Sequence, residues 1–379
     1  MKNIHVGSYQ MQPAGYKAFI PGSFPPAGLT QTPSFLLKKT NEATRLLGKL
    51  DGVTLLLPNA DFFLLMYLKK DAASSSQIEG TIATMINAIE AEVNPNANLP
   101  EDVDDIIHYI KALNYGIKRV KSENFPVSLR LIKELHYQLL HQARSSHYAN
   151  PGEFRTTQNW VGGTKPDNAK FVPPPVPFMF NALADLESFI HADDVFPTII
   201  KAGLIHAQFE TIHPFLDGNG RTGRMLITIY LWQKGLIEKP VLFLSSYFKK
   251  HRQVYYEKLE GYHQGKVNEW LEFFLDGVVE IATEAILIAE KITQLREQDM
   301  SKIQSLGKRS AKVGMSILPR LFAQPIVNVQ TIAEWTGYTY DGAYKVIQRL
   351  LDLGILNEKD PDIKYGQVYV YKNYLDIFA

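Results

Sequence analysis

Cysteine is absent from the 379-residue sequence, which excludes disulfide bonds, thiol nucleophiles and thiolate metal sites and is typical of a reducing compartment. The chain also lacks a strong net charge, because 40 Lys and Arg residues balance 39 Asp and Glu residues. No overall field therefore draws it to nucleic acid or anionic lipid. No apolar run reaches the roughly 18 residues that span a bilayer, and residues 1–33 lack the basic and apolar segments of a secretory signal. We therefore expect a cytoplasmic protein without membrane contact.

A helical pattern runs through most of the chain. Apolar residues recur at three- and four-residue spacing, which is typical of amphipathic helices. The length exceeds what one hydrophobic core usually organises, so we expect two or three domains. The predicted fold class is mainly α, with helices over residues 31–50, 62–89, 102–120, 129–141, 179–190, 198–212, 221–234, 247–263 and 268–296.

Two segments depart from this helical pattern. Between residues 150 and 177, β-formers and a turn at residues 165–168 predict a β-hairpin over residues 159–173. After a basic connector that contains Lys308, Arg309 and Lys312, two short helices (331–336 and 341–353) precede β-like segments near Ile355 and residues 367–371. This order predicts a C-terminal winged helix-turn-helix domain. The expected sections are residues 1–100, 101–299 and 300–379.

Residues 213–224, His-Pro-Phe-Leu-Asp-Gly-Asn-Gly-Arg-Thr-Gly-Arg, form the most informative stretch. Pro214 disfavours helical conformation at His213, and a new helical pattern begins near Gly220, so the stretch is a loop that opens a helix. Gly218, Asn219 and Gly220 adopt positive φ easily, which lets their N–H groups form a nest at the positive end of the helix dipole. The pattern predicts a cradle for phosphate.

The charged residues of this loop suit the same ligand. Arg221 and Arg224 lie in the first helical turn, where the dipole disfavours a cation by some tenths of a kcal/mol, and an anionic ligand would offset that cost. Asp217 supplies a hard oxygen for Mg²⁺, and His213 suits a proton acceptor near neutral pH. Taken singly, a His before Pro or an Asp-Gly-Asn-Gly turn is more often structural.

Together these residues reproduce the HPFxDGNGRxxR signature of the Fic family, and residues 206–213 resemble the helix that leads into it. The resemblance implies a protein adenylyltransferase that uses ATP and Mg²⁺. His213 would deprotonate a Ser, Thr or Tyr hydroxyl of a target protein, and Asp217 would bind the metal. The phosphates would lie on residues that the motif assigns to nucleotide binding: Asp217, Gly218, Asn219, Gly220, Arg221, Thr222, Gly223 and Arg224.

Two further segments resemble parts of the same family. Residues 155–164 are similar to its flap, which implies that Val161, Gly162, Gly163 and Thr164 lie beside the nucleotide. A strand edge there could accept the target segment by β-augmentation; the alternative is a plain surface hairpin. Tyr255 and Tyr256 resemble the pair that lines the adenosine pocket, although aromatic residues at helical spacing usually pack in the core.

Residues 75–80, Ser-Ser-Gln-Ile-Glu-Gly, match the (S/T)xxxE(G/N) pattern of an inhibitory helix. Its place before the core motif resembles the class of Fic proteins whose inhibitor is N-terminal and in cis. The resemblance implies that Ser75 and Glu79 act as a brake, with the Glu79 carboxylate pairing with Arg224 where the γ-phosphate would bind. Alternatively, Ser76 and Glu79 form a capping box at the start of a helix.

Three functions stay open on the sequence alone. The first is AMP transfer to a protein hydroxyl, with self-modification in vitro. The second is AMP removal at the same site, with Glu79 positioning a water molecule. The third is DNA-binding regulation by the winged helix, with the core as a nucleotide sensor; Lys345, Arg349 and Arg320 are among its few cations. Proteins of this type often form homodimers, but no stretch identifies an interface.

Overall fold

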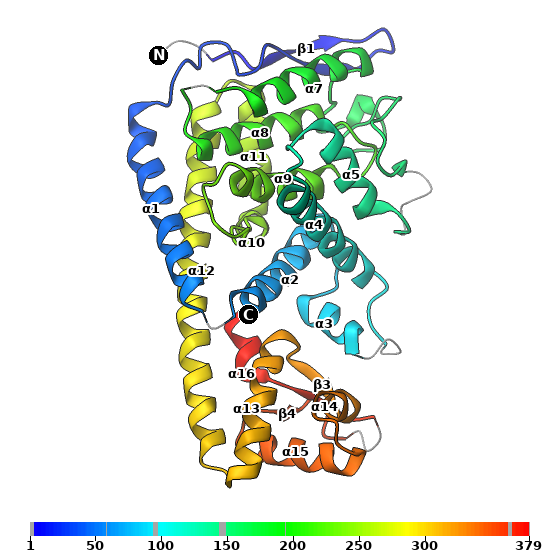
Figure 1. The fold of residues 1–379 in the computed structure, drawn as a ribbon. Coiled ribbons are helices and arrows are strands. Elements are labelled where there is room, and N and C mark those ends of the chain that lie inside the picture. The colour runs from blue at the N-terminus through cyan, green and yellow to red at the C-terminus, as the bar shows by residue number, and fades with distance from the viewer. Residues whose placement is uncertain are drawn as a thin grey trace.

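The computed structural model describes residues 4–57, 59–93, 98–143, 149–193, 195–362 and 366–378. Within them the fold is mainly helical, as predicted, with a two-stranded and a three-stranded antiparallel sheet. The long helix α12 (Val267–Gln304) runs along the molecule from the helical core to the C-terminal elements, and α1 (Ser34–Leu56) lies against its first half (Figure 1). No helix of the described segments is long and apolar enough to cross a membrane.

Two helices that are buried on nearly all sides form the centre of the core. In α8 (Thr198–Ile212) every residue except Thr198 and Glu210 is buried, and most of α9 (Asn219–Gln233) is buried as well. A helix that is apolar all round packs inside other helices. The surrounding helices are α4 (Val103–Glu123), α5 (Leu129–Leu140), α7 (Val176–His191), α10 (Ser245–Lys250) and α11 (Arg252–His263).

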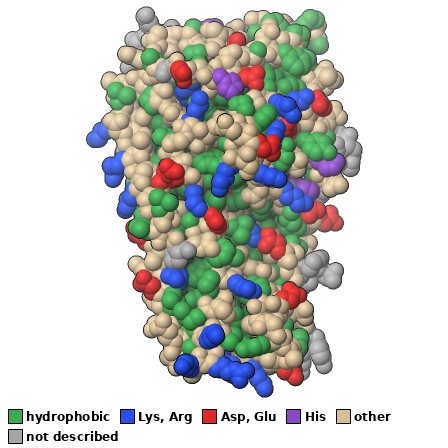
Figure 2. All heavy atoms as spheres, viewed as in Figure 1, with side chains coloured by type: hydrophobic (Ala, Val, Ile, Leu, Met, Phe, Trp, Pro, Cys, Tyr) green, Lys and Arg blue, Asp and Glu red, His purple; other side chains and the backbone are tan. Residues whose placement is uncertain are grey.

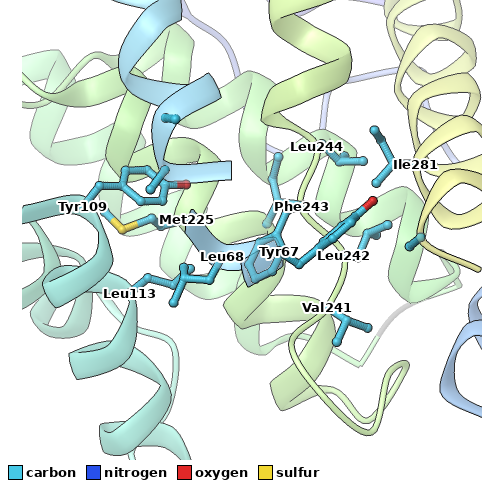
Figure 3. Close-up of a cluster of buried hydrophobic side chains, with 14 of the residues drawn as sticks. Tyr67, Leu68, Tyr109, Leu113, Met225, Val241, Leu242, Phe243, Leu244 and Ile281 are labelled. Carbon is cyan, nitrogen blue, oxygen red and sulfur yellow. The ribbon is translucent and has the colours of Figure 1, made fainter. Parts of the chain in front are cut away.

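The helix α2 (Ala60–Ile78) belongs to this same core, although the sequence placed it in a separate N-terminal section. Figure 3 shows Tyr67 and Leu68 of α2 beside Leu113 of α4 and Met225 of α9, with residues 241–244 close by. The short helix α3 (Met85–Val93) follows α2 and packs against it and α4. The end of α2 is therefore fixed next to the start of α9.

An N-terminal hairpin, which the sequence did not reveal, covers one end of the core. Strands β1 (Gly7–Met11) and β2 (Lys17–Pro21) pair antiparallel, with Gly7 opposite Pro21. The buried Phe19 of β2 donates its N–H to the carbonyl of Val172 at 2.9 Å, which ties the hairpin to the flap segment.

The flap itself is not a regular β-hairpin. Residues 159–173 form one bridge, between Val161 and Phe171, and a 3₁₀ turn at Pro166–Asn168 (η1). Gly162 and Gly163 have φ of 69° and 72°, and this left-handed backbone breaks a strand ladder. The three prolines at 173–175 supply no N–H to extend it.

The C-terminal elements include the two predicted helices followed by strands, together with α13, β3, α16 and η2, which the sequence analysis did not predict. The segment expected as a basic connector is helix α13 (Lys308–Ala323), whose apolar stripe of Ile317, Leu318, Leu321 and Phe322 is buried. The remaining elements are β3 (Ile326–Asn328), α14 (Val329–Thr336), α15 (Tyr340–Asp352), β4 (Asn357–Glu358), β5 (Val368–Val370), α16 (Lys372–Leu375) and the 3₁₀ turn η2 (Asp376–Phe378). The sheet order is β3-β5-β4.

Several predicted element bounds differ from the structure. The helical stretch expected over residues 62–89 is two helices, α2 and α3. The helix expected over residues 247–263 is two helices, α10 and α11, that meet at His251. The boundary expected near residue 300 lies inside α12, where the buried Asp299 accepts a hydrogen bond from the Tyr371 hydroxyl at 2.6 Å. This contact ties α12 to the last elements of the chain.

Candidate active site

The loop between α8 and α9 forms one wall of a cavity of about 690 Å³. His213 ends α8 in a left-handed conformation with φ of 49°, and Gly218, with φ of 76°, precedes α9. The cavity is bounded by this loop, the flap, α11, the end of α2 and the N-terminal hairpin. Its lining includes Tyr9, Glu79, Trp160, Val161, Gly162, Glu210, His213, Leu216, Asp217, Gly218, Asn219, Gly220, Arg224, Tyr255, Tyr256 and His263.

Donors from outside the loop hold its carbonyl groups. The Arg155 side chain donates from Nε to the carbonyl of His213 at 3.0 Å, and its backbone N–H donates to Pro214 at 2.9 Å. Asn159 donates from Nδ2 to the carbonyl of Phe215 at 2.8 Å. Because these loop carbonyls already accept hydrogen bonds from Arg155 and Asn159, they do not need donors from α9. The first-turn N–H groups of α9, which have no acceptor within the helix, can therefore donate to an anion.

Arg155 is itself buried, with about 1% of its surface exposed, and burial lowers its pKa to about 10. Four backbone carbonyls, of residues 157, 174, 212 and 213, accept from this guanidinium. The Arg155 guanidinium therefore links the flap segment to the loop between α8 and α9. No sequence pattern predicts this role, because the contacts of Arg155 with residues 212 and 213 join positions 57 and 58 residues apart.

His213 has the protonation state of a base. Burial lowers its pKa to about 4, so the imidazole is neutral at neutral pH. Its Nδ1 lies 3.3 Å from the carbonyl of Glu210, a contact in which Nδ1 carries the hydrogen. In this tautomer Nε2 has a free electron pair and can accept a proton.

Asp217 lies on the cavity wall with about 40% of its side chain exposed. One carboxylate oxygen accepts the N–H of Gly218 at 2.7 Å, and the other lies 3.6 Å from the guanidinium of Arg221. The described part of the chain holds no group of three or more His, Cys, Asp or Glu side chains for a metal. A single carboxylate suits Mg²⁺, which takes its other ligands from phosphate oxygens and water.

Several residues predicted to bind the nucleotide lie outside the cavity lining. Arg221 is buried between Asp217 and Asp105, whose carboxylate lies 3.9 Å away. Gly163 and Thr164 belong to the tip of the flap, where Asn168 accepts the N–H of Thr164 at 3.0 Å. Thr222 and Gly223 are buried behind the wall.

Arg224 and Glu79 meet at the start of α9. Arg224 Nη2 donates to Glu79 Oε1 at 2.7 Å, and its Nε donates to the hydroxyl of Ser75 at 2.9 Å. A Cβ at Gly220 would collide with Glu79 Oε1 and lie 2.9 Å from Arg224 Nη1, so glycine permits this approach. The structure thus brings the predicted brake residues Ser75 and Glu79 to Arg224.

The capping-box alternative for Ser76 and Glu79 is wrong. Both lie at the end of α2, where Glu79 is the C-cap, and no helix begins there. The loop that follows is held by α4 and its N-cap, since the carboxylate of Asp102 accepts the N–H groups of Ile82 and Ala83 at 2.5 and 3.1 Å. Glu79 is therefore held by α2, which precedes it, and by the loop bonded to Asp102, which follows it.

The tyrosine pair is divided between the core and the cavity. Tyr255 is buried and its hydroxyl lies 2.9 Å from His206 Nε2, whereas Tyr256 is 41% exposed. Both line the cavity. Core packing and pocket lining are therefore compatible at Tyr255.

Glu210 is a cavity residue that the sequence analysis did not select. Its Oε1 is buried and has no hydrogen-bond partner among the described residues. Burial raises its pKa to about 7, although the nearby Arg224 cation opposes the shift. The sequence pattern does not single it out, because Glu210 is one of several polar residues in the last turns of α8, with His206, Gln208 and Thr211.

Replacement of Glu210 by glutamine should therefore stabilise the protein in a pH-dependent way. A carboxyl whose pKa is raised on folding loses stability as pH rises from its unfolded pKa, near 4.5, through about 7. The melting temperature of Glu210→Gln minus that of wild type should increase between pH 5 and 8. The exposed Glu101→Gln variant is the control, and a flat Glu210→Gln difference would refute the buried carboxyl.

Two family models match the chain. The model described as "Fic/DOC family N-terminal" matches residues 37–118, and the model described as "Fic/DOC family" matches residues 126–231. The first contains Glu79 and the second contains the whole loop of residues 213–224. The matched segments thus meet at the cavity.

Curated proteins with the name "Protein adenylyltransferase Fic" are similar to part of the chain. The protein of Culex quinquefasciatus is 26% identical over 204 residues, and that of Drosophila grimshawi is 28% identical over 207 residues. Each match covers 52% of this chain, but 38% and 39% of the relatives. The chain thus matches less than half the length of these proteins.

Solved structures show the same fold. A Fic family protein from Desulfovibrio desulfuricans G20 aligns with a TM-score of 0.57 at 16% identity, over 90% of this chain and 97% of that chain. Fic-1 (residues 134–508) from C. elegans aligns with a TM-score of 0.51 at 19% identity, over 67% of this chain and 72% of that chain.

Proposed function

The chain belongs to the Fic/DOC family, and on that premise we propose that it is a protein adenylyltransferase, which moves AMP from ATP to a Ser, Thr or Tyr hydroxyl of a target protein. One observation carries the proposal: a neutral His213 lines the same cavity as the N-terminal end of α9. A proton acceptor and an anion site within one cavity are what hydroxyl attack on a phosphate requires.

The residues divide the reaction between them. The target hydroxyl donates its proton to Nε2 of His213 while its oxygen attacks the α-phosphorus of ATP, and pyrophosphate leaves. The first turn of α9 and the Arg224 cation stabilise the phosphate charge. Asp217 holds Mg²⁺, which when bound neutralises charge on the phosphate oxygens. Tyr255 and Tyr256 border the space for the nucleoside.

Glu79 acts as a brake on this reaction. Its carboxylate pairs with Arg224 beside Gly220, at the place where the terminal phosphate of ATP would pair with the same guanidinium. A carboxylate and a phosphate compete there for one cation. With Glu79 in place, ATP is excluded from the productive position.

The target presents its hydroxyl beside the flap, and the chain itself is a second acceptor in this proposal. We also propose a cytoplasmic location, which is supported only by the sequence features described above. Intact-protein mass spectrometry of the Glu79→Gly variant with ATP and Mg²⁺, with and without added proteins, tests the function. A gain of the mass of AMP supports transfer. Loss of AMP from a pre-labelled protein, without any gain, would instead indicate removal.

We further propose that the C-terminal module is a winged helix that binds duplex DNA. The turn between α14 and α15 and the sheet order β3-β5-β4 support the fold. Figure 2 shows Lys and Arg side chains gathered at the lower end of the molecule, where the C-terminal elements lie. Lys345 and Arg349 are exposed on α15, next to the 45%-exposed Tyr344.

A gel-shift measurement on the full chain tests DNA binding. We expect a shift of a random duplex at low salt that weakens steeply as salt rises, because phosphate contacts release counterions. The double variant Lys345→Ala/Arg349→Ala should weaken binding. The variant Lys118→Ala/Lys121→Ala on α4 removes the same charge elsewhere and should not. No salt-sensitive shift, or equal loss in both variants, would refute the proposal.

A further inference from the structure

His136 of α5 touches the loop between α8 and α9 from the side opposite the cavity. It is fully buried, and its ring stacks on Phe215 at 3.7 Å between centroids and 3° between planes. A Cβ at Gly218 would lie 3.4 Å from its ring, which shows how closely the two pack. His136 is absent from the cavity lining, so it acts on the site through the loop.

Two hydrogen bonds define the tautomer of this ring. The N–H of Gly152 reaches Nδ1 of His136 at 2.8 Å, and a backbone N–H can only donate. Nδ1 is therefore the acceptor, and Nε2 carries the hydrogen. Nε2 lies 2.9 Å from the carbonyl oxygen of Asp217 and donates to it.

The peptide between Asp217 and Gly218 is consequently held at both ends. Its carbonyl is bonded to His136 behind the loop, and its N–H is bonded to the Asp217 carboxylate at 2.7 Å. Gly218 has φ of 76° and no Cβ, so the backbone there turns at little steric cost. Without the His136 donor, this carbonyl would be free to rotate toward the cavity, where an oxygen repels phosphate.

We propose that His136 is a positioning residue that holds the Asp217–Gly218 peptide so that the carboxylate of Asp217, and not its carbonyl, faces the nucleotide phosphates. The role of the phosphates and of Mg²⁺ in this statement rests on the proposed function. The orientation of the peptide does not.

Crystal structures of two α5 variants test the peptide orientation without reference to activity. His136→Phe keeps a ring on Phe215 but has no donor or acceptor. Leu135→Ala removes a fully buried side chain from the same helix that packs against Gly116 of α4, away from the loop. We expect the peptide to turn in His136→Phe and to stay in Leu135→Ala. His136→Leu replaces the Phe variant if that one does not fold. An unturned peptide in the variant without a donor overturns the proposal.

Calorimetric titration with ATP, with and without Mg²⁺, tests the consequence in a Glu79→Gly background. Loss of a group that orients a metal ligand typically costs about 10- to 100-fold in metal affinity. We expect His136→Phe to lose that much of the Mg²⁺-dependent gain in ATP affinity, and also to bind ATP alone more weakly than the parent, because the turned carbonyl repels the phosphates. His136→Gln, which keeps a side-chain donor, should recover part of the gain, and Leu135→Ala should retain it.

The outcomes separate the two proposals. If His136→Phe retains the full Mg²⁺-dependent gain and only melts earlier, as Leu135→Ala should, His136 is merely structural. If the Glu79→Gly parent shows neither ATP binding nor a Mg²⁺-dependent gain, the proposed function fails, and the crystal comparison still decides the role of His136.

Discussion

Glu79→Gly should raise the initial rate of AMP transfer about 5- to 150-fold over wild type, the range that corresponds to a coupling free energy of 1–3 kcal/mol. In the wild type, the Glu79 carboxylate occupies the guanidinium of Arg224 at 2.7 Å and lies against Gly220. Its removal leaves Arg224 bonded to Ser75, in place to receive a phosphate. The measurement is the time course of intact-protein mass with ATP and Mg²⁺.

Two further substitutions separate the carboxylate from the backbone. Glycine also loosens the chain at the end of α2, whereas Glu79→Ala removes the carboxylate with less change in backbone freedom. If the carboxylate is the brake, Glu79→Ala should be as active as Glu79→Gly. Glu79→Gln keeps the length but not the charge and should fall between them and wild type. Equal rates in Glu79→Gly and wild type would rule out the brake.

Much of the helical core was predictable because its pattern is local. The helix expected over residues 198–212 has those bounds in the structure, since Pro197 precedes it and Pro214 follows closely. The amphipathic α15 was also found, within one residue at each end. By contrast, α13 was read as a connector because its charges stood out more than its apolar stripe.

Other elements depend on partners that a single sequence does not show. The N-terminal hairpin pairs within itself and lies on the flap through Phe19, and neither contact has a sequence pattern of its own. The flap was predicted as a hairpin from β-formers, but the left-handed Gly162 and Gly163 and the prolines at 173–175 interrupt its ladder.

The candidate site shows the same division. The residues contiguous in the motif were found together, because one loop carries His213, Asp217 and the glycines. Arg155, Asn159 and His136 were missed as parts of the site, since each acts by donating to a loop carbonyl from a distant segment. A polar side chain that bonds only to backbone has no spacing that a sequence could reveal.

In the Glu79→Gly background, His213→Ala should lower the rate of transfer by about 10²- to 10⁴-fold, the usual contribution of a positioned general base. The His213 imidazole lies against the carbonyl of Glu210 in α8 and not against the first turn of α9, so ATP should still bind to that turn when the imidazole is removed. His108→Ala is the matched control, because His108 is a buried histidine of α4 outside the cavity lining. Equal rates in both variants would contradict the role of His213.

The pH dependence gives an independent check on the same base. Because burial lowers the pKa of His213 to about 4, its neutral form is already complete at pH 6.5, where an ordinary histidine is half protonated. Loss of the base should therefore begin only as pH falls toward 4. A step in the Glu79→Gly rate that is centred on pH 6.5, and that is absent from the residual rate of Glu79→Gly/His213→Ala, would show that His213 is solvated and not held as the structure has it.

The mass measurement on the same two variants tests transfer, base and brake together. A gain of the mass of AMP in Glu79→Gly that vanishes in Glu79→Gly/His213→Ala would establish all three. No gain in either variant would favour AMP removal or a regulatory role.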